Sequence, residues 1–199
     1  MDDKRDSFHD RVRQGEQPFS IDETEGKHCV VACPPHPLHG GNRNDRRLID
    51  VCKELKERGI SCLRFDYGDW DDSEGETQDV IEAVEFAQAR WERIGLFGYS
   101  FGAFVSSKAV KEIKTGVECL GLLAPPGRAS DFLEGVEIPV YVLAGERDST
   151  VDSSRVVETV ERSELLPADH FFVGQGPKVA RRFGDFFEKC LKQGEKHKG

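Results

Sequence analysis

A short stretch near the middle of the chain, GYSFG at positions 98–102, has the residue types and spacing of a serine nucleophile in a tight turn. It follows an apolar run and precedes a stretch, 103–113, with the pattern of a helix. A strand that turns directly into a helix strains the residue between them, and flanking glycines relieve the crowding. Because Gly98 and Gly102 stand at these positions, we expect Ser100 to project its hydroxyl above a helix N-terminus.

The base and the acid that such a serine needs can be sought later in the chain. A serine hydroxyl is a weak nucleophile and requires a histidine, which a carboxylate holds in the right tautomer. Of the two histidines that follow, His197 lies in a charged tail, whereas His170 lies directly after a predicted strand end. For the acid we choose Asp148, in the turn after the strand PVYVLA, and keep Asp152 in reserve because it is well placed to cap the next helix.

The developing negative charge of such a reaction needs an oxyanion hole, built from two backbone N–H groups. One is expected from Phe101, the residue after the serine. The other is expected from the loop CPPHPLHGG at 33–41, in which the prolines cannot donate. His36 is the first choice and Leu38 the second. The side chains of His36 and His39 either line the pocket or merely add polarity to the loop.

Strand-like and helix-like segments that could position these residues alternate along nearly the whole chain. Strands are predicted at 18–23, 28–33, 60–67, 93–99, 116–126 and 138–145, and a last one ends within the stretch ELLPADHFF, before His170. Helices are predicted at 44–59, 77–91, 103–113, 152–161 and 177–193. The first of these helices has Asn44 or Asp45 as N-cap, and the second has Thr77. This alternation predicts an α/β fold, with a mostly parallel, doubly wound sheet and helices on both faces.

The domain organisation is expected to be simple. We predict a polar N-terminal arm or frayed helix over 1–17, one domain over 18–193 and a disordered tail over 194–199. About a dozen residues separate the strand ending in APP from IPVYVL, which is loop length and too short for a helical cap domain. The site should therefore be open. Its aromatic lining is sought among Phe101, Trp70, Phe132 and Phe104, the last of which is favoured as core.

Charge and hydropathy argue against several classes of partner. The formal net charge is −9, and acidic residues are scattered in company with Lys and Arg. Such a surface repels phosphate backbones and anionic lipid, so neither nucleic acid nor a membrane is expected as a partner. No apolar run approaches the roughly 18 residues that span a bilayer, and the N-terminus lacks the apolar segment of a signal peptide. We therefore predict a cytoplasmic protein.

The cysteines are predicted to be small buried hydrophobes in a reducing compartment. There are six: Cys29, Cys33, Cys52, Cys62, Cys119 and Cys190. The stretch CVVACPPHPLH could be taken for a zinc site. However, Cys29 and Cys33 fall within a predicted strand, where a four-residue separation places the two sulfurs about 13 Å apart. No metal is therefore expected.

Six motifs in register carry a family resemblance over about residues 19–190. PPHPLHGG, LRFDYGDWDDSEGE, GYSFGAFVSS, GLLAPPGRASDF, VLAGERDSTVD and ADHFF together resemble the α/β-hydrolase superfamily. More narrowly, they resemble its small lidless, dienelactone-hydrolase-like branch with a His-Pro-His-Pro loop. The resemblance implies an α/β-hydrolase fold without a cap domain. It also implies a triad of Ser100, Asp148 and His170, with an oxyanion contact from the loop around His36.

The function predicted from these residues is that of a serine hydrolase. It would cleave esters or thioesters of small acids through an acyl-enzyme, with amides less favoured and no cofactor needed. The expected partner is the small-molecule substrate, and a homodimer is compatible with the sequence. One rival reading is a non-catalytic binding or scaffold protein of the same fold. A weaker rival is a redox or metal protein that uses the cysteines.

Overall fold

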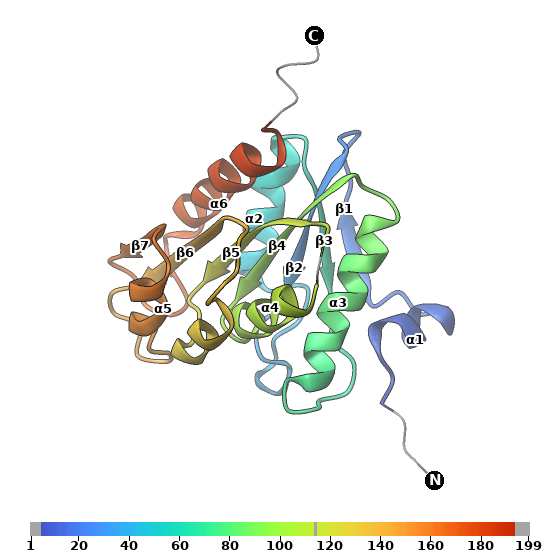
Figure 1. The fold of residues 1–199 in the computed structure, drawn as a ribbon, viewed down its shortest axis with the longest axis horizontal. Helices are drawn as coiled ribbons and strands as arrows, with labels where there is room; N and C mark the ends of the chain where they lie inside the picture. Colours follow the sequence, from blue (N-terminus) through green and yellow to red (C-terminus); the bar gives the residue numbers. More distant parts are fainter. Residues whose placement is uncertain (1–4, 114, 194–199) are drawn as a thin grey trace.

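The architecture is built on one seven-stranded sheet, seen in a computed structural model that describes residues 5–113 and 115–193 (Figure 1). The strand order is β1-β3-β2-β4-β5-β6-β7; β1 pairs antiparallel with β3, and the other neighbours are parallel. The strands are β1 (Phe19–Asp22), β2 (His28–Cys33), β3 (Ser61–Phe65), β4 (Arg93–Tyr99), β5 (Val117–Leu123), β6 (Val140–Gly145) and β7 (Ser163–Leu166). The predicted doubly wound α/β sheet is confirmed.

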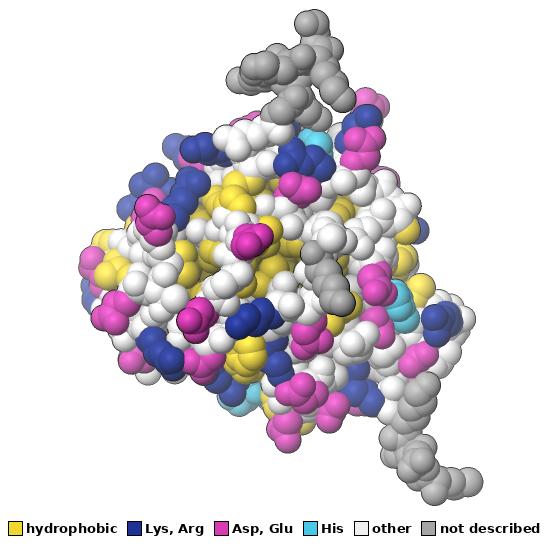
Figure 2. Space-filling model, in the orientation of Figure 1, with side chains coloured by type: hydrophobic (Ala, Val, Ile, Leu, Met, Phe, Trp, Pro, Cys, Tyr) yellow, Lys and Arg dark blue, Asp and Glu magenta, His cyan; other side chains and the backbone are white. Residues whose placement is uncertain are grey.

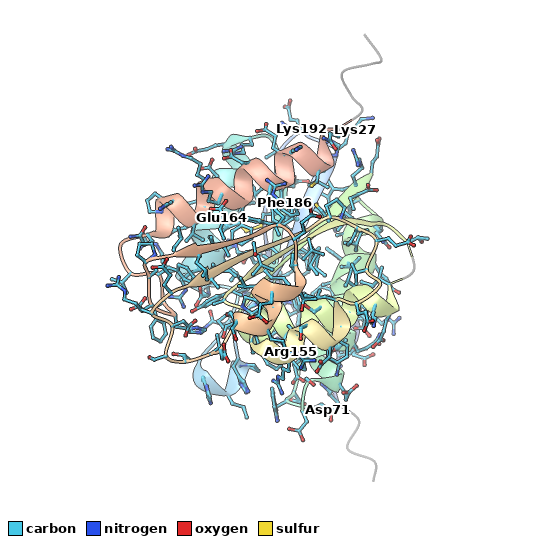
Figure 3. The ribbon with its side chains drawn as sticks, turned by 60° about the vertical axis from the view of Figure 1, so that its left-hand side comes forward. Lys27, Asp71, Arg155, Glu164, Phe186 and Lys192 are labelled. Atoms are coloured by element: carbon cyan, nitrogen blue, oxygen red, sulfur yellow. A yellow bond between two sulfur atoms is a disulfide. The ribbon has the colours of Figure 1, made fainter. Side chains whose placement is uncertain are left out.

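Helices cover both faces of the sheet (Figure 1). They are α1 (Phe8–Arg13), α2 (Arg46–Glu57), α3 (Glu74–Gln88), α4 (Phe101–Glu112), α5 (Ser154–Thr159) and α6 (Gly176–Leu191). Helices α2 and α6 pack on one face, where Phe186 of α6 points to the strands (Figure 3). Helices α3, α4 and α5 pack on the other face, with α1 beside α3. Each face thus buries its own hydrophobic cluster, and every residue of β2 is buried between them.

Helix α3 begins earlier than the sequence pattern suggested. Ser73 is its N-cap, and the Glu76 carboxylate accepts hydrogen bonds from the amides of Asp71 (2.9 Å) and Ser73 (2.8 Å). Thr77, predicted as the cap, lies inside the first turn and donates its hydroxyl to the Ser73 carbonyl. The prediction was wrong because the acidic residues before Thr77 belong to the helix. Their negative charges interact favourably with the positive N-terminal end of the helix and so stabilise its earlier start.

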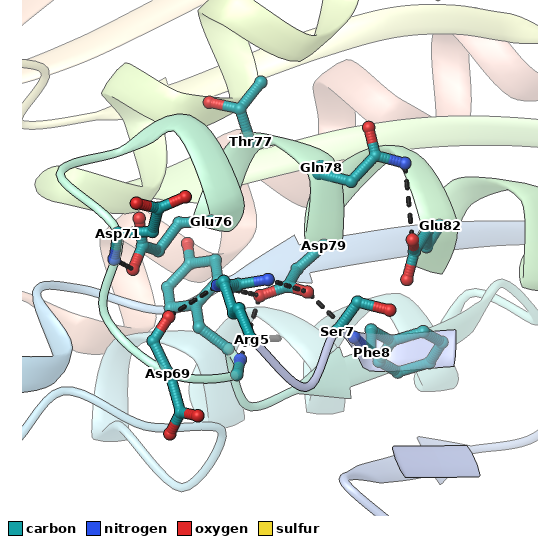
Figure 4. A network of polar contacts seen from close by, with 12 residues as sticks. Arg5, Ser7, Phe8, Asp69, Asp71, Glu76, Thr77, Gln78, Asp79 and Glu82 are labelled. Carbon is teal, nitrogen blue, oxygen red and sulfur yellow. Dashed lines mark hydrogen bonds and ion pairs between the residues drawn. The ribbon is translucent and has the colours of Figure 1, made fainter. Parts of the chain in front are cut away.

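The N-terminal segment is docked on the domain. Phe8 of α1 is completely buried and packs edge-on against Phe65 and Phe86. The fully buried Asp79 of α3 accepts the Phe8 amide at 2.8 Å and forms an ion pair with Arg5 (Figure 4). Residues 5–13, expected as a polar arm or frayed helix, are therefore anchored by one apolar ring and one buried acid. The tail predicted over 194–199 lies outside the described residues.

The cysteines correct one sequence expectation. Cys52 of α2 and Cys62 of β3 form a disulfide, with their Cα atoms 5.4 Å apart. They were predicted as unpaired hydrophobes; packing of α2 beside β3 brings them within bonding reach although ten positions separate them. Cys29 and Cys33 lie on β2 as predicted, and burial raises the pKa of both thiols. Within 5–113 and 115–193, no group of three or more His, Cys, Asp or Glu is placed to hold a metal ion.

The surface mixes charges of both signs. Figure 2 shows Lys and Arg interspersed with Asp and Glu over the visible face. None of the helices in the described part of the chain has the length and apolar character needed to cross a membrane.

Candidate active site

Ser100 occupies a strained turn between β4 and α4. Its φ of +56° and ψ of −115° are rarely adopted by residues with a side chain, and such strain concentrates at functional positions. Its amide donates to the Leu123 carbonyl of the neighbouring strand at 2.9 Å, and its carbonyl accepts the Ala103 amide at 3.0 Å. The turn is thus fixed both by the sheet and by the first turn of the helix.

The two flanking glycines are required by close backbone contacts. A Cβ on Gly98 would lie 2.4 Å from the Gly102 carbonyl oxygen. A Cβ on Gly102 would lie 2.2 Å from the carbonyl oxygen of Cys33, at the end of β2. The expected relief of crowding is therefore confirmed. Gly102 does more than that, because it also lets the loop after β2 approach the start of α4.

Replacing Gly102 by alanine should lower the free energy of unfolding. The neighbouring atom is a backbone oxygen, so strand β2 or helix α4 must move, and we expect a loss of about 2–3 kcal/mol. Urea unfolding followed by circular dichroism measures the loss. Gly135→Ala serves as the control, because its added Cβ meets nothing within 4 Å. The positive φ of Gly135 means that this variant also carries some backbone strain. Equal stability of Gly102→Ala and the wild type would contradict this account.

The imidazole of His170 lies between Ser100 and Asp148. Its Nε2 is 3.0 Å from the Ser100 hydroxyl oxygen, and its Nδ1 is 2.7 Å from Oδ2 of Asp148. Both the His170 and the Asp148 side chains are almost completely buried. The second Asp148 oxygen accepts the amides of Thr150 (2.8 Å) and Val151 (3.0 Å), which fixes the carboxylate. These contacts form a continuous hydrogen-bonded line from carboxylate to hydroxyl.

The three residues come from the carboxyl ends of three parallel strands. Ser100 follows β4, Asp148 follows β6, and His170 follows β7. The reserve acid, Asp152, instead accepts the Ser154 amide at the start of α5. This hydrogen bonding lowers the pKa of Asp152. Of the two predicted acids, therefore, Asp148 is the one that contacts His170.

The predicted oxyanion residues meet beside this line. Phe101 is the first residue of α4, where an amide has no acceptor within the helix. The His36 ring lies 4.8 Å from that of Phe101, whereas the Leu38 side chain is 65% exposed. Partial burial, His39 and Arg128 together lower the pKa of His36, which favours a neutral imidazole. The ring contact concerns side chains and not amides, so the choice between the amides of His36 and Leu38 stays a prediction.

Aromatic rings form one wall next to Phe101. Trp70 stacks on His36 with a ring separation of 4.5 Å, and His39 stacks on His36 at 4.6 Å. Trp70 also lies 5.5 Å from Phe101. Among the predicted lining residues, Phe101 and Trp70 are thus brought together. Phe104 is buried and packs against Phe132, in agreement with a core role.

The support of this wall was missed by the sequence analysis. The Tyr67 hydroxyl donates to the Pro34 carbonyl at 3.0 Å and so ties the loop after β3 to the loop that carries His36. The Gly68 amide donates to Asp79 at 2.8 Å, which fastens the same loop to α3. The sequence gives no signal for this support, because Glu76, Asp79 and Glu82 are acids on a helix, where charged residues are ordinarily exposed, yet all three are buried.

Comparison with known proteins identifies the fold. No protein-family model matches the chain. The uncharacterized protein RP471 of Rickettsia prowazekii is 25% identical over 198 residues, covering 81% of this chain and 83% of that protein. An α/β serine hydrolase homologue from Coxiella burnetii superposes with a TM-score of 0.74 at 26% identity, covering 84% and 90% of the two chains. The chain has the α/β-hydrolase fold.

Two further solved structures are similar to this chain. XC6422 from Xanthomonas campestris, an α/β serine hydrolase without a lid, is 27% identical with a TM-score of 0.69 over 83% and 88% of the chains. Dienelactone hydrolase from Anabaena variabilis has a TM-score of 0.76 at 18% identity over 86% and 91%. Between β5 and β6 this chain has one short 3-10 segment, Gly127–Phe132, in agreement with the expected absence of a cap domain.

Proposed function

We propose that this protein is a serine hydrolase that cleaves carboxylic esters or thioesters of small acids. The observation that carries the proposal is the His170 imidazole, within hydrogen-bond reach of both the Ser100 hydroxyl and the Asp148 carboxylate. A nucleophile, a base and a group that orients the base are what acyl transfer through a serine requires. The strained turn at Ser100 and the serine hydrolases among the structural neighbours support the same reading.

The reaction follows from the contacts of the three side chains. His170 Nε2 takes the proton of Ser100 as its oxygen attacks the carbonyl carbon, and Asp148 stabilises the imidazolium that forms. The amides of Phe101 and His36 hold the oxyanion of the tetrahedral intermediate. His170 then gives its proton to the departing alcohol or thiol. Water, activated by the same imidazole, attacks the acyl-enzyme and releases the acid.

The short β5–β6 connection and the ring wall bear on the substrate. Without a cap domain the acyl group meets an open site, which suits small acids and gives little binding energy for a long chain. The half-buried rings of His36 and Trp70 pack against the ring of Phe101, the residue after the serine. Every group in this scheme is a side chain or amide of the chain, so the proposed reaction requires no cofactor. A cytoplasmic location and a homodimer stay predictions.

Hydrolysis of matched esters and thioesters tests the proposal. Purified protein, kept in a chelator, is assayed with nitrophenyl acetate, butyrate and octanoate and with the corresponding acyl thioesters. We expect turnover to fall from the short to the long acyl chain and to be insensitive to the chelator. No turnover of any ester or thioester would favour the non-catalytic binding or scaffold protein. Activity lost in the chelator would favour a metal-dependent reaction.

A further inference from the structure

Tyr99, the residue before Ser100, contacts the main chain of His170. It is the last residue of β4 and is 1% exposed. Its hydroxyl donates to the His170 carbonyl at 3.1 Å in a buried setting. Its ring centroid lies 5.4 Å from that of the imidazole, with the two planes 32° apart. The tyrosine thus touches both the backbone and the ring of the residue proposed as the base.

The turn that carries His170 is held by hydrogen bonds before, at and after the histidine. Downstream, the Asp169 carboxylate accepts the amides of Phe171 (3.1 Å) and Val173 (3.4 Å), and the Asp169 carbonyl accepts the Phe172 amide. These bonds shape the turn. Upstream, the Ala168 carbonyl accepts the Arg147 amide at 3.0 Å, which joins the start of the turn to the segment after β6. In the described structure, the hydrogen bonds of His170 itself join its imidazole to Ser100 and Asp148, and its carbonyl to Tyr99. At His170 itself, the bond from the backbone to the sheet is therefore the one from the tyrosine hydroxyl.

The surroundings hold Tyr99 in place and keep it protonated. The Arg47 guanidinium of α2 lies 4.7 Å from the centre of the Tyr99 ring and 5.9 Å from that of Phe171, so it packs against both. Arg47 is itself fixed by an ion pair with Asp45, the N-cap of α2. Burial raises the pKa of Tyr99, so its hydroxyl stays a neutral donor over the range in which hydrolases are assayed.

We propose that Tyr99 is a positioning residue that sets the distance between the base and the nucleophile. Two consecutive residues at the end of β4 contact His170: the Tyr99 hydroxyl bonds its backbone carbonyl, and the Ser100 hydroxyl bonds its imidazole. A central strand of a parallel sheet is among the most rigid parts of a domain, and a misplacement of about 1 Å costs roughly 100-fold in rate. The inference rests on the proposed function, since it concerns the same three side chains.

The substitution Tyr99→Phe tests it, because the ring stays and the donor is removed. The buried His170 carbonyl then lacks its partner, and the backbone at His170 can shift. We expect kcat for a nitrophenyl ester to fall about tenfold, with KM within roughly twofold of the wild type. We also expect the downfield proton resonance of the His170 Nδ1 to Asp148 hydrogen bond to broaden or vanish. Melting curves report on the fold separately.

A matched control is Tyr141→Phe. Tyr141 is a buried tyrosine on β6, on the same sheet face, and packs against Phe183 and Phe186. The Tyr141→Phe variant should have the kcat and the downfield resonance of the wild type. An unchanged kcat in Tyr99→Phe, an equal fall in both variants, or a downfield resonance that persists in Tyr99→Phe would each overturn the inference.

The proposed function and the positioning role of Tyr99 can fail separately. If the wild type hydrolyses no ester or thioester, the proposed function fails, and the nuclear magnetic resonance comparison still decides whether Tyr99 positions His170. If the wild type is active and Tyr99→Phe matches it in kcat, the positioning role fails and the hydrolase stands.

Discussion

Replacing Ser100 by alanine is expected to lower kcat for a nitrophenyl ester by 10⁴-fold to 10⁶-fold, to the level that binding and the oxyanion amides alone provide. The variant removes the oxygen that attacks the carbonyl and leaves the turn intact, because the backbone hydrogen bonds of Ser100 remain. KM for the ester should change little, since the hydroxyl contributes little to ground-state binding. Initial rates of wild type and variant, with a correction for spontaneous hydrolysis, measure the difference.

Ser107→Ala is the matched control for that loss. Ser107 is a buried serine of α4, and its hydroxyl donates to the Ala103 carbonyl at 2.8 Å, within the helix itself. Its removal should leave kcat within about twofold of the wild type. Residual activity of Ser100→Ala above one per cent of the wild type would argue for a different nucleophile and against the proposed reaction.

Replacing Asp148 by asparagine is expected to lower kcat by about 10⁴-fold. An asparagine can keep the bonds from the amides of Thr150 and Val151, so the turn should survive. Its NH₂ group, however, can donate to Nδ1 of His170, which favours the tautomer that carries its proton on Nε2. That tautomer cannot accept the proton of Ser100. Initial rates near neutral pH measure the loss.

Asp152→Asn separates the two acids that the sequence left as alternatives. The Asp152 carboxylate accepts the amide of Ser154, the first residue of α5, and Asp152 is exposed to solvent. We expect kcat to stay within about twofold of the wild type, with only a slight loss of stability. A larger fall of kcat in Asp152→Asn than in Asp148→Asn would assign the acid to Asp152.

The sheet could be predicted because its signals are local. Buried parallel strands form short apolar runs, and the amphipathic helices between them leave a period of about 3.6 residues. The run HCVVAC is β2, and Leu48, Val51, Cys52 and Leu55 are the buried face of α2. Once strands and helices alternate, handedness and short connections leave few topologies. The carboxyl ends of the strands, and hence the edge that carries the candidate site, follow from the pattern.

Contacts between distant parts of the chain could not be predicted in this way. The Cys52–Cys62 disulfide depends on the register between α2 and β3, which no local pattern specifies. The buried pair of Arg5 and Asp79 is also hidden, because a charged residue on a helix is ordinarily exposed. Asp79 can be buried because the amides of Phe8 and Gly68 both donate hydrogen bonds to its carboxylate.

In the candidate site, too, some residues could be predicted from local patterns and others could not. Ser100 and His170 could be named from residue type and chain order, and Asp148 could be preferred over Asp152 because it directly follows a strand. Tyr99 could not, since a tyrosine at the end of an apolar strand has the pattern of a core residue. Its role depends on which carbonyl the hydroxyl meets, and that is fixed by the packing of the loop after β7 against β4.

Labelling with a fluorophosphonate tests the central claim most directly, because the reagent reacts with a serine only when a base activates it. Wild type and Ser100→Ala are incubated with the probe, and intact mass and peptide mapping locate the adduct. We expect a single adduct on the wild type, on the peptide that contains Ser100, and none on the variant. A wild type that stays unlabelled, or an adduct that persists on Ser100→Ala, would contradict it.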